Sequence, residues 1–238
     1  MKSEFDGFAK SYDESLKNAL KTVNIDASYF TEYKVKELYN YYKKTSVSPK
    51  KILDFGCGVG NSSYFLSQYF PGAEIYGVDI SKESIQLAQK REIKNTIFDI
   101  YDGENLLFEK ESFDAVFISN VFHHIDHDKH IALLEQIRLI LKKEGILFFF
   151  EHNTLNPVTQ KIVNDCIFDK DARLLNFLYT KKIFKEVGFQ NKVNFILFIP
   201  PKFKKLLFLE KYLRWLPFGG QYLTIAKKED RRKNNVQK

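Results

Sequence analysis

The 238-residue sequence is poor in cysteine and contains no long apolar run. Its two cysteines, Cys57 and Cys166, are too few to define a disulfide scaffold, which favours a reducing, cytoplasmic compartment. No apolar stretch approaches the roughly 18 to 20 residues that a membrane-spanning helix requires. Residues 1–7 carry two acidic side chains and no apolar core, so we expect no signal peptide there.

Apolar and aromatic side chains, by contrast, are abundant. Hydrophobic residues make up 44% of the chain and aromatic residues 16%, with 23 phenylalanines. A chain of this length can bury a core without metal or disulfide support. The run from Phe148 to Phe150 is typical of a strand that is buried on both faces. We therefore expect a single α/β domain over residues 1–238.

The net charge of +7 is concentrated near the end of the sequence. Residues 227–238 form a basic, polar tail without the aromatic side chains of a nucleic-acid stacking platform. The simpler interpretation is a solvated terminus. We therefore expect no nucleic-acid partner.

Strand-like and helix-like segments alternate along residues 51–150. Short apolar segments predict strands, and apolar residues at helical spacing predict helices. The expected strands cover residues 51–55, 74–79, 96–100, 113–119, 146–150 and 221–226, and the expected helices cover 4–21, 27–44, 61–69, 82–90 and 129–141. Ser81 is placed to cap the helix over 82–90. The alternation predicts parallel βαβ units in a doubly wound α/β sheet.

Polar and glycine residues follow the predicted strands. In a doubly wound sheet, ligands bind beyond the carboxyl ends of the strands. Five places meet that condition: residues 54–60, Asp79, Asp102, Asn120 and residues 151–153. The functional site is expected where these places come together.

The segment Asp54-Phe55-Gly56-Cys57-Gly58-Val59-Gly60 is the most specific signal in the sequence. Glycine permits a positive φ and a close approach of the main chain to a ligand. A nicotinamide-nucleotide fingerprint, G-x-G-x-x-G, would place its third glycine at Asn61, one residue after Gly60. A P-loop would need G-K-[ST], which is absent. The pattern D-x-G-x-G-x-G therefore disfavours both kinds of phosphate-binding loop.

Asp79 ends the second predicted strand, 19 residues after Gly60. A carboxylate at this position can accept both hydrogen bonds of a ribose diol. The spacing suits a dinucleotide site equally well, so a nicotinamide-dependent oxidoreductase stays open as an alternative.

The glycine pattern resembles motif I of class I S-adenosylmethionine (SAM)-dependent methyltransferases. From about residue 51 to 150 the chain is similar to the ubiquinone-biosynthesis-type (UbiE-like) small-molecule methyltransferases, in the stretches L-D-F-G-C-G-V-G, I-Y-G-V-D-I-S, F-D-I-Y-D-G-E-N-L, S-F-D-A-V-F-I-S-N-V-F-H-H-I and L-K-K-E-G-I-L. The resemblance implies a Rossmann-like, seven-stranded sheet, mostly parallel with an antiparallel last strand, and helices on both faces. It also implies SAM as the cofactor, with S-adenosylhomocysteine as its product.

The resemblance assigns roles to individual residues. Asp79 and Ile80 would hold the ribose and one adenine face, and Asp102 with Gly103 would meet the adenine edge. Asn120 would lie under the sulfonium. Tyr12, in the stretch F-D-G-F-A-K-S-Y-D, would complete a lid over the cofactor. The methionine side would be lined by the loop residues Asp54, Gly56, Cys57, Gly58 and Gly60.

The single domain is expected to have four parts. Residues 1–48 would form an N-terminal helical lid, residues 49–152 the SAM-binding core, residues 153–226 a substrate-side half with insertions, and residues 227–238 the tail. The stretches E-H-N-T-L-N-P and Q-Y-L in the substrate-side half resemble methyltransferases encoded among polysaccharide-biosynthesis enzymes. That resemblance places a saccharide or saccharide-linked group first among small-molecule acceptors.

Two histidines follow predicted strands on the substrate side. If the methyl acceptor is a hydroxyl, a base must take its proton. His124 follows the fourth predicted strand, and His152 follows the fifth, next to Glu151. Our hypothesis is that His124 or His152 is the general base and that Glu151 orients or polarises it.

The other histidines receive simpler interpretations. His123 is expected to be packed, while His127 and His130 are expected to be solvated at the start of a helix. The histidine spacing would permit a metal cluster, but methyl transfer requires no metal and no cysteine joins the set. We therefore expect no metal site.

Residues 202–216 mix apolar with basic side chains and include the single tryptophan, Trp215. A basic amphipathic helix of this kind can make peripheral contact with a membrane surface. It can equally be a lid whose apolar face packs on the core, and this is the interpretation that we favour. Membrane contact would make a lipid-linked or quinone acceptor plausible.

Several functions therefore compete. The leading one is SAM-dependent methylation of a small molecule, at oxygen or nitrogen. Another candidate is an inactive SAM-fold module that only binds partners. The intact acidic and glycine positions argue against it. RNA methylation is compatible with the basic tail, but Ser119-Asn120-Val121-Phe122 stands where base-directed N-methyltransferases carry an N-P-P-Y-type motif.

Overall fold

The computed structural model describes residues 27–166 and 172–229. The predicted helix over 4–21, the lid residue Tyr12 and residues 230–238 of the tail lie outside the described residues. The helices are α2 (Ala27–Thr45), α3 (Asn61–Tyr69), α4 (Lys82–Gln89), α5 (His130–Ile140), α6 (Pro157–Asn164), α7 (Phe177–Val187) and α8 (Glu210–Leu213), with 3-10 segments η2 (Phe122–His124), η3 (His127–Lys129) and η5 (Pro201–Leu209). The strands are β1 (Lys51–Phe55), β2 (Glu74–Asp79), β3 (Thr96–Ile100), β4 (Phe113–Ser119), β5 (Leu141–His152), β6 (Phe189–Ile196) and β7 (Gln221–Lys228).

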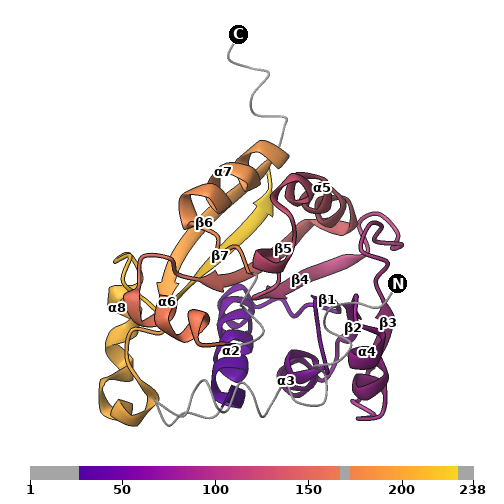
Figure 1. Ribbon diagram of the computed structural model, residues 1–238. Helices are drawn as coiled ribbons and strands as arrows, with labels where there is room; N and C mark the ends of the chain where they lie inside the picture. Colours follow the sequence, from indigo (N-terminus) through magenta and orange to yellow (C-terminus); the bar gives the residue numbers. More distant parts are fainter. Residues whose placement is uncertain (1–26, 167–171, 230–238) are drawn as a thin grey trace.

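One seven-stranded sheet runs through the middle of the molecule, in the order β3-β2-β1-β4-β5-β7-β6 (Figure 1). Strand β1 pairs in parallel with β2 and β4, and β5 continues the parallel sheet from β4. Strand β7 runs antiparallel to both of its neighbours, β5 and β6. The prediction of a doubly wound, mostly parallel sheet with an antiparallel last strand is therefore confirmed.

Alternate residues of the central strands pack against opposite layers of helices. Ile52, Phe117 and Phe148 belong to an apolar cluster with residues of α2 and α3. Leu53 and Phe149 belong to a second cluster, with residues of α5 and α7. Figure 1 shows these helix pairs on the two sides of the sheet. Because both faces are covered, the central strands are apolar throughout, and the run from Phe148 to Phe150 is fully buried as predicted.

Most of the predicted elements appear at their predicted bounds, and the largest difference is in β5. That strand begins at Leu141 rather than at residue 146, because Leu141 pairs with Phe113 before a register shift. Strand β7 extends to Lys228 because its pairing with β6 continues to Phe189. Ser81 caps α4 as predicted, since its hydroxyl accepts from the Ser84 N–H at 3.2 Å.

The segment between β6 and β7, residues 197–220, is closed at its base. The Gly220 N–H donates to the Leu197 carbonyl at 3.1 Å. The Asn153 side-chain amide, 1% exposed, donates to the carbonyls of Pro217 (3.0 Å) and Gly219 (2.7 Å). The Asn156 amide donates to Phe218 and the Thr159 hydroxyl to Gly220. The residues that follow β5 therefore fix the chain that enters β7.

The prediction that residues 202–216 pack an apolar face on the core is wrong. No residue of η5 is buried. The buried residue of α8 is the polar Glu210, whereas most of the large apolar side chains are exposed and Leu207, Leu213 and Leu216 are partly buried. Among residues 27–166 and 172–229, no helix is both long enough and apolar enough to cross a membrane.

Candidate functional site

The glycine loop follows β1 and leads into α3. Gly56, Gly58 and Gly60 all have positive φ, between 52° and 82°. A Cβ on Gly56 would lie 2.3 Å from Val121 Cγ2, so only glycine fits there. A Cβ on Gly58 would meet no atom of the described residues within 4 Å. The loop is thus packed tightly at its start and open at its middle.

Asp54 fixes the start of α3 rather than facing solvent. Its carboxylate is 1% exposed and accepts from the hydroxyls of Ser62 and Ser63, at 2.6 Å each. Burial raises the pKa of Asp54 to about 6, against the lowering effect of these hydrogen bonds. Asp54 therefore sets the angle between β1 and α3, and with it the shape of the loop.

Asp79, at the end of β2, holds the same loop from the other side. One carboxylate oxygen accepts from the Gly58 N–H and the other from the Ser81 N–H, both at 2.8 Å. Each carboxylate oxygen has a second lone-pair position. Asp79 can therefore shape the loop and still accept hydrogen bonds from a ligand's hydroxyl groups.

Cys57 contributes through its main chain. Its N–H donates to the Val78 carbonyl at 3.0 Å. Its side chain is buried in a small apolar cluster with Ile85, Ala88 and Phe98. Burial raises the pKa of the Cys57 thiol well above its ordinary value, so the residue is a packed thiol rather than a nucleophile.

The ends of β2 and β3 meet beside the loop. Ile80 is 47% exposed, and a Cβ on Gly103 would lie 3.3 Å from Ile80 Cδ1. The exposed Asp102 accepts from the N–H groups of Glu104 and Asn105, at 2.7 Å each. These hydrogen bonds, that of Asn105 foremost, hold the pKa of Asp102 below its ordinary value. The structure thus places the exposed side chain of Ile80 beside the turn that holds the exposed carboxylate of Asp102.

Asn120 follows β4 directly and adopts a left-handed conformation, with φ of 56°. Its N–H donates to the Phe150 carbonyl at 2.9 Å. Its Oδ1 atom is buried and has no hydrogen-bond partner among the residues described. An unpaired buried acceptor is costly unless a ligand supplies a donor. Asn120 is therefore a ligand-binding candidate on structural grounds alone.

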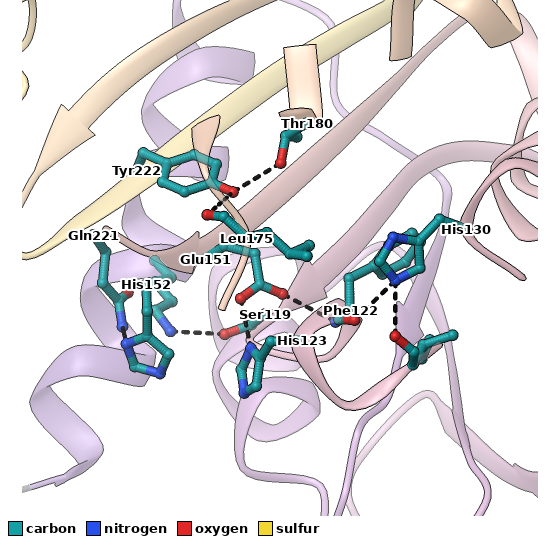
Figure 2. Close-up of polar contacts among 12 residues, drawn as sticks. Ser119, Phe122, His123, His130, Glu151, His152, Leu175, Thr180, Gln221 and Tyr222 are labelled. Carbon is teal, nitrogen blue, oxygen red and sulfur yellow. Dashed lines mark hydrogen bonds and ion pairs between the residues drawn. The ribbon is translucent and has the colours of Figure 1, made fainter. Parts of the chain in front are cut away.

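Glu151 and His123 form a buried pair at the ends of β5 and β4 (Figure 2). Glu151 is fully buried, and its two oxygens accept from His123 Nδ1 at 2.6 Å and from the Phe122 N–H at 2.9 Å. Burial alone would raise the pKa of Glu151, but His123 and the two other nearby histidines bring it below its ordinary value. Glu151 thus orients His123, the histidine that the sequence marked only as packed.

His124 and His152 both lie next to this pair. The His123 ring centroid is 4.2 Å from that of His124 and 5.3 Å from that of His152. Both of these neighbouring histidines are only partly buried. His152 Nδ1 also lies 3.4 Å from Gln221 Nε2 (Figure 2). The structure therefore brings His124, His152 and Glu151 into one cluster, in which His123 contacts all three.

The solvated interpretation of His130 is wrong, whereas that of His127 agrees with its exposure. His130 is fully buried, and its Nε2 atom lies 3.0 Å from the carbonyls of both Phe122 and Ile125. Its Nδ1 atom lies 3.0 Å from the Tyr179 hydroxyl. Burial lowers the pKa of His130, so the neutral ring holds the turn after β4 in place.

A buried lysine completes the site. Lys34 of α2 is 4% exposed and donates to the Ser119 hydroxyl at 2.8 Å. Burial lowers the pKa of Lys34 to about 7, against the opposing charge of Glu151. Sequence reasoning did not find this residue. The available signal was its place at helical spacing from Leu38 and Tyr41, on the apolar stripe of α2.

Metal ligation finds no support in the part of the chain that the structure describes. No group of three or more His, Cys, Asp or Glu side chains there could hold an ion.

The chain is similar in sequence to known methyltransferases. Residues 52–145 match the methyltransferase domain family. The chain is 31% identical to demethylmenaquinone methyltransferase of Thermotoga maritima over 66% of this chain and 62% of that relative. It is 31% identical to malonyl-[acyl-carrier protein] O-methyltransferase of Bacillus cereus over 66% of this chain and 55% of that relative. The chain thus spans a little over half of the length of these curated relatives.

A solved structure extends the likeness to the whole fold. The plantazolicin methyltransferase BpumL in complex with S-adenosylhomocysteine superimposes with a TM-score of 0.67, at 20% identity, over 95% of this chain and 100% of that one. Residues 52–145 thus carry the methyltransferase domain, and the chain has the fold of the solved SAM-dependent methyltransferases.

Proposed function

We propose that the protein transfers the methyl group of SAM to a small-molecule acceptor at the carboxyl ends of β4 and β5. The observation that carries the proposal is the glycine loop, which Asp79 holds from the side while the space at Gly58 stays open. The unpaired Oδ1 atom of Asn120 gives this end of the sheet a free acceptor. These groups fit SAM, which has hydroxyl and amino donors and no phosphate.

In this proposal each predicted cofactor residue keeps a role that its surroundings support. Gly56, Gly58 and Gly60 bring the main chain close to the cofactor, and Asp54 and Cys57 shape the loop from behind it. Asp79 accepts from the ribose hydroxyls, while Ile80, Asp102 and Gly103 border the adenine. Asn120 lies towards the sulfonium. When bound, SAM supplies a methyl group on a positively charged sulfur, which departs as a neutral thioether.

Calorimetric titration with SAM and S-adenosylhomocysteine tests the cofactor site. We expect micromolar binding by the wild type and at least a tenfold loss in Asp79→Ala, which corresponds to roughly 1.4 kcal/mol. The titration includes NAD(P) as the competing ligand. Binding of NAD(P) in place of SAM would overturn the proposal.

The acceptor is proposed from two separate observations. The resemblance of residues 151–157 and 221–223 to enzymes of polysaccharide biosynthesis favours O-methylation of a saccharide or saccharide-linked group. The exposed apolar side chains of residues 203–218 favour a lipid-linked or quinone acceptor. Transfer of a radiolabelled methyl group from SAM to a panel of both classes distinguishes them. No nucleic acid is included as an acceptor in this proposal.

We propose that His124 or His152 takes the proton of the acceptor and that Glu151 acts through His123. Both rings lie within ring contact of His123, whose Nδ1 is fixed by Glu151. A positioned base contributes typically about 10²- to 10⁴-fold to the rate. The buried pair keeps His123 in one orientation, which in turn limits where its neighbours can point.

Single substitutions test the base with the acceptor that the panel identifies. The base should lose about 10²-fold or more in kcat when changed to alanine, with SAM affinity retained. His127→Ala is the matched control, because His127 is exposed and stacks on Tyr179 away from Glu151. Near-normal turnover in both His124→Ala and His152→Ala would refute the hypothesis.

We propose that the chain works as one unit in a reducing cytoplasm. Both cysteines are buried. Residues 49–152 would hold the cofactor, residues 153–226 the acceptor, and residues 1–48 would cover them, with the tail at 227–238 apart from the site. Within residues 1–48, α2 already contributes Lys34 to the acceptor end.

A further inference from the structure

The segment between β6 and β7 presents an aromatic surface to solvent. Seven of its large apolar side chains are between 36% and 76% exposed. A patch of this kind on a folded protein marks an interaction site more often than a packing defect. The aromatic surface consists of Phe203, Leu206, Phe208, Leu209, Tyr212, Trp215 and Phe218.

The polar side of the same segment is fixed to the body of the protein. Glu210 is 5% exposed and accepts from the Tyr33 hydroxyl at 2.7 Å and from the N–H groups of Phe198 and Ile199. The Arg214 guanidinium pairs with Glu37 of α2. Because Glu210 and Arg214 bind the body of the protein, the opposite side of the segment, which carries the aromatic surface, faces solvent.

Lysines surround the aromatic side chains. Lys202, Lys204, Lys205 and Lys211 are all exposed. Two of them lie over rings of the surface, at 5.2 Å for Lys202 on Phe203 and 4.8 Å for Lys211 on Tyr212. Residues 197–220 contain one acidic residue, the buried Glu210. The surface therefore presents positive charge and apolar area with no exposed negative charge.

The surface continues onto the start of α6. Leu155 and Val158 are 45% and 60% exposed, on either side of Asn156. The Asn156 amide donates to the Phe218 carbonyl at 2.7 Å, so the two exposed regions are joined.

We propose that the aromatic surface binds the headgroup region of a lipid bilayer that contains anionic phospholipid. Aromatic side chains with a polar edge and lysines with long apolar stems are the residues that settle at this boundary. The core of a protein–protein interface is depleted in lysine, whereas here lysines are interleaved with the aromatic rings. A diffuse negative surface is the partner that suits this pattern of charge.

Binding there would bring the acceptor end of the site towards the bilayer. The segment leads directly into Gln221 of β7, which pairs with His152 of β5. Delivery of a lipid-linked acceptor from the membrane to the histidines is a consequence that rests on the proposed methyl transfer. Membrane binding itself does not rest on it.

Co-sedimentation with vesicles tests the proposal on the full chain. One vesicle set is phosphatidylcholine alone and the other adds phosphatidylglycerol. We expect binding to the anionic vesicles that is at least roughly tenfold tighter and that weakens with salt. Trp215→Ser with Phe218→Ser, and Lys204→Ala with Lys205→Ala, should each weaken this binding roughly tenfold or more.

Leu107→Ser is the matched control, because Leu107 is 88% exposed but lies between β3 and β4, outside the aromatic surface. It should bind vesicles as the wild type does. Calorimetric SAM binding by every variant establishes that the fold is intact and separates this proposal from the proposed function. Wild-type binding that is absent, or that both double variants retain, would overturn the proposal. So would a concentration-dependent dimer that replaces vesicle binding and that Trp215→Ser abolishes, because the surface would then pair two copies.

Discussion

The two ends of the site are built in different ways. At the cofactor end, the carboxylates of Asp79 and Asp102 accept hydrogen bonds from main-chain N–H groups that lie 2 to 21 residues away in the sequence. At the acceptor end, ionisable side chains contact other polar side chains across much longer separations. Lys34 and Ser119 are 85 residues apart, and His152 and Gln221 are 69 residues apart.

This difference determines how each end of the site responds to pH. Main-chain donors carry no titratable charge and keep their positions once the loop has its φ angles, so these donors do not change with pH, and the group at this end whose pKa is raised to about 6 is Asp54 behind the loop. The acceptor end holds Lys34 and Glu151 in the core, where charge is costly. Its protonation state therefore responds to pH and to whatever binds there.

The largest expected effect concerns the buried lysine. The pKa of Lys34 falls from 10.5 to about 7 on folding, so between these values the unfolded chain binds a proton that the folded chain does not. The free energy of unfolding should thus rise with pH across this range, relative to Lys34→Met, by up to about 5 kcal/mol. Urea denaturation at several pH values measures it.

Lys43→Met serves as the control for this experiment, because Lys43 is an exposed lysine on the same helix. If the free energy of unfolding changed with pH in the same way for Lys34→Met and the wild type, the prediction would be wrong. The two ends of the site would then respond to pH alike.

A second prediction concerns the glycines of the cofactor end. Gly56→Ala should lower the free energy of unfolding by about 3 kcal/mol, because its Cβ would clash with Val121 at a positive φ. Gly58→Ala should cost only about 1 kcal/mol, since its Cβ meets open space, yet it should weaken SAM binding. Denaturation and calorimetry on both variants check this. Equal losses of stability would show that the loop is not divided into a packed start and an open middle.

A third prediction addresses the long-range contacts of the acceptor half. Asn153→Ala removes two buried hydrogen bonds to the carbonyls of Pro217 and Gly219, and should cost about 2 kcal/mol. Asn164→Ala, at an exposed position on α6, should stay within about 0.5 kcal/mol of the wild type. Chemical denaturation distinguishes the two, and a negligible cost for Asn153→Ala would mean that β7 enters the sheet without this support.

The smallest effect is expected at the cap of α4, next to the cofactor end. Ser81→Ala should cost about 1 kcal/mol through the lost hydrogen bond to the Ser84 N–H. For a chain of this size the midpoint of thermal unfolding should fall by about 2 to 4 °C. An unchanged midpoint would show that the main chain at Ser81 is held by Asp79 alone.

The same contrast explains what the sequence could predict. The cap at Ser81 depends on a neighbour close in sequence and appears as predicted, whereas the hydrogen bonds of Asp79 with the N–H groups of Gly58 and Ser81 were not predicted. The partner of Glu151 could not be chosen from the sequence, because His123 and His124 are adjacent and a 3-10 turn decides which one faces β5. His130 was misplaced because its carbonyl partners belong to the preceding turn.

The bounds of the regular elements follow the same logic. Helices and strands between residues 51 and 119 were predictable because each is short and apolar and ends at a glycine, an aspartate or a turn. The outward-facing segment after β6 was not, because its orientation is set by Glu210 and Arg214 reaching α2, 177 residues away.

The closed base of residues 197–220 leaves few fixed points inside this stretch. Its two ends are hydrogen-bonded to each other and to Asn153, Asn156 and Thr159, and within it Glu210 and Arg214 contact α2. Loop length costs little free energy once the ends are joined. A related protein's segment that keeps these two side chains should therefore fit between Leu197 and Gly220 without change to the glycine loop, which leaves the rest of the stretch open to replacement.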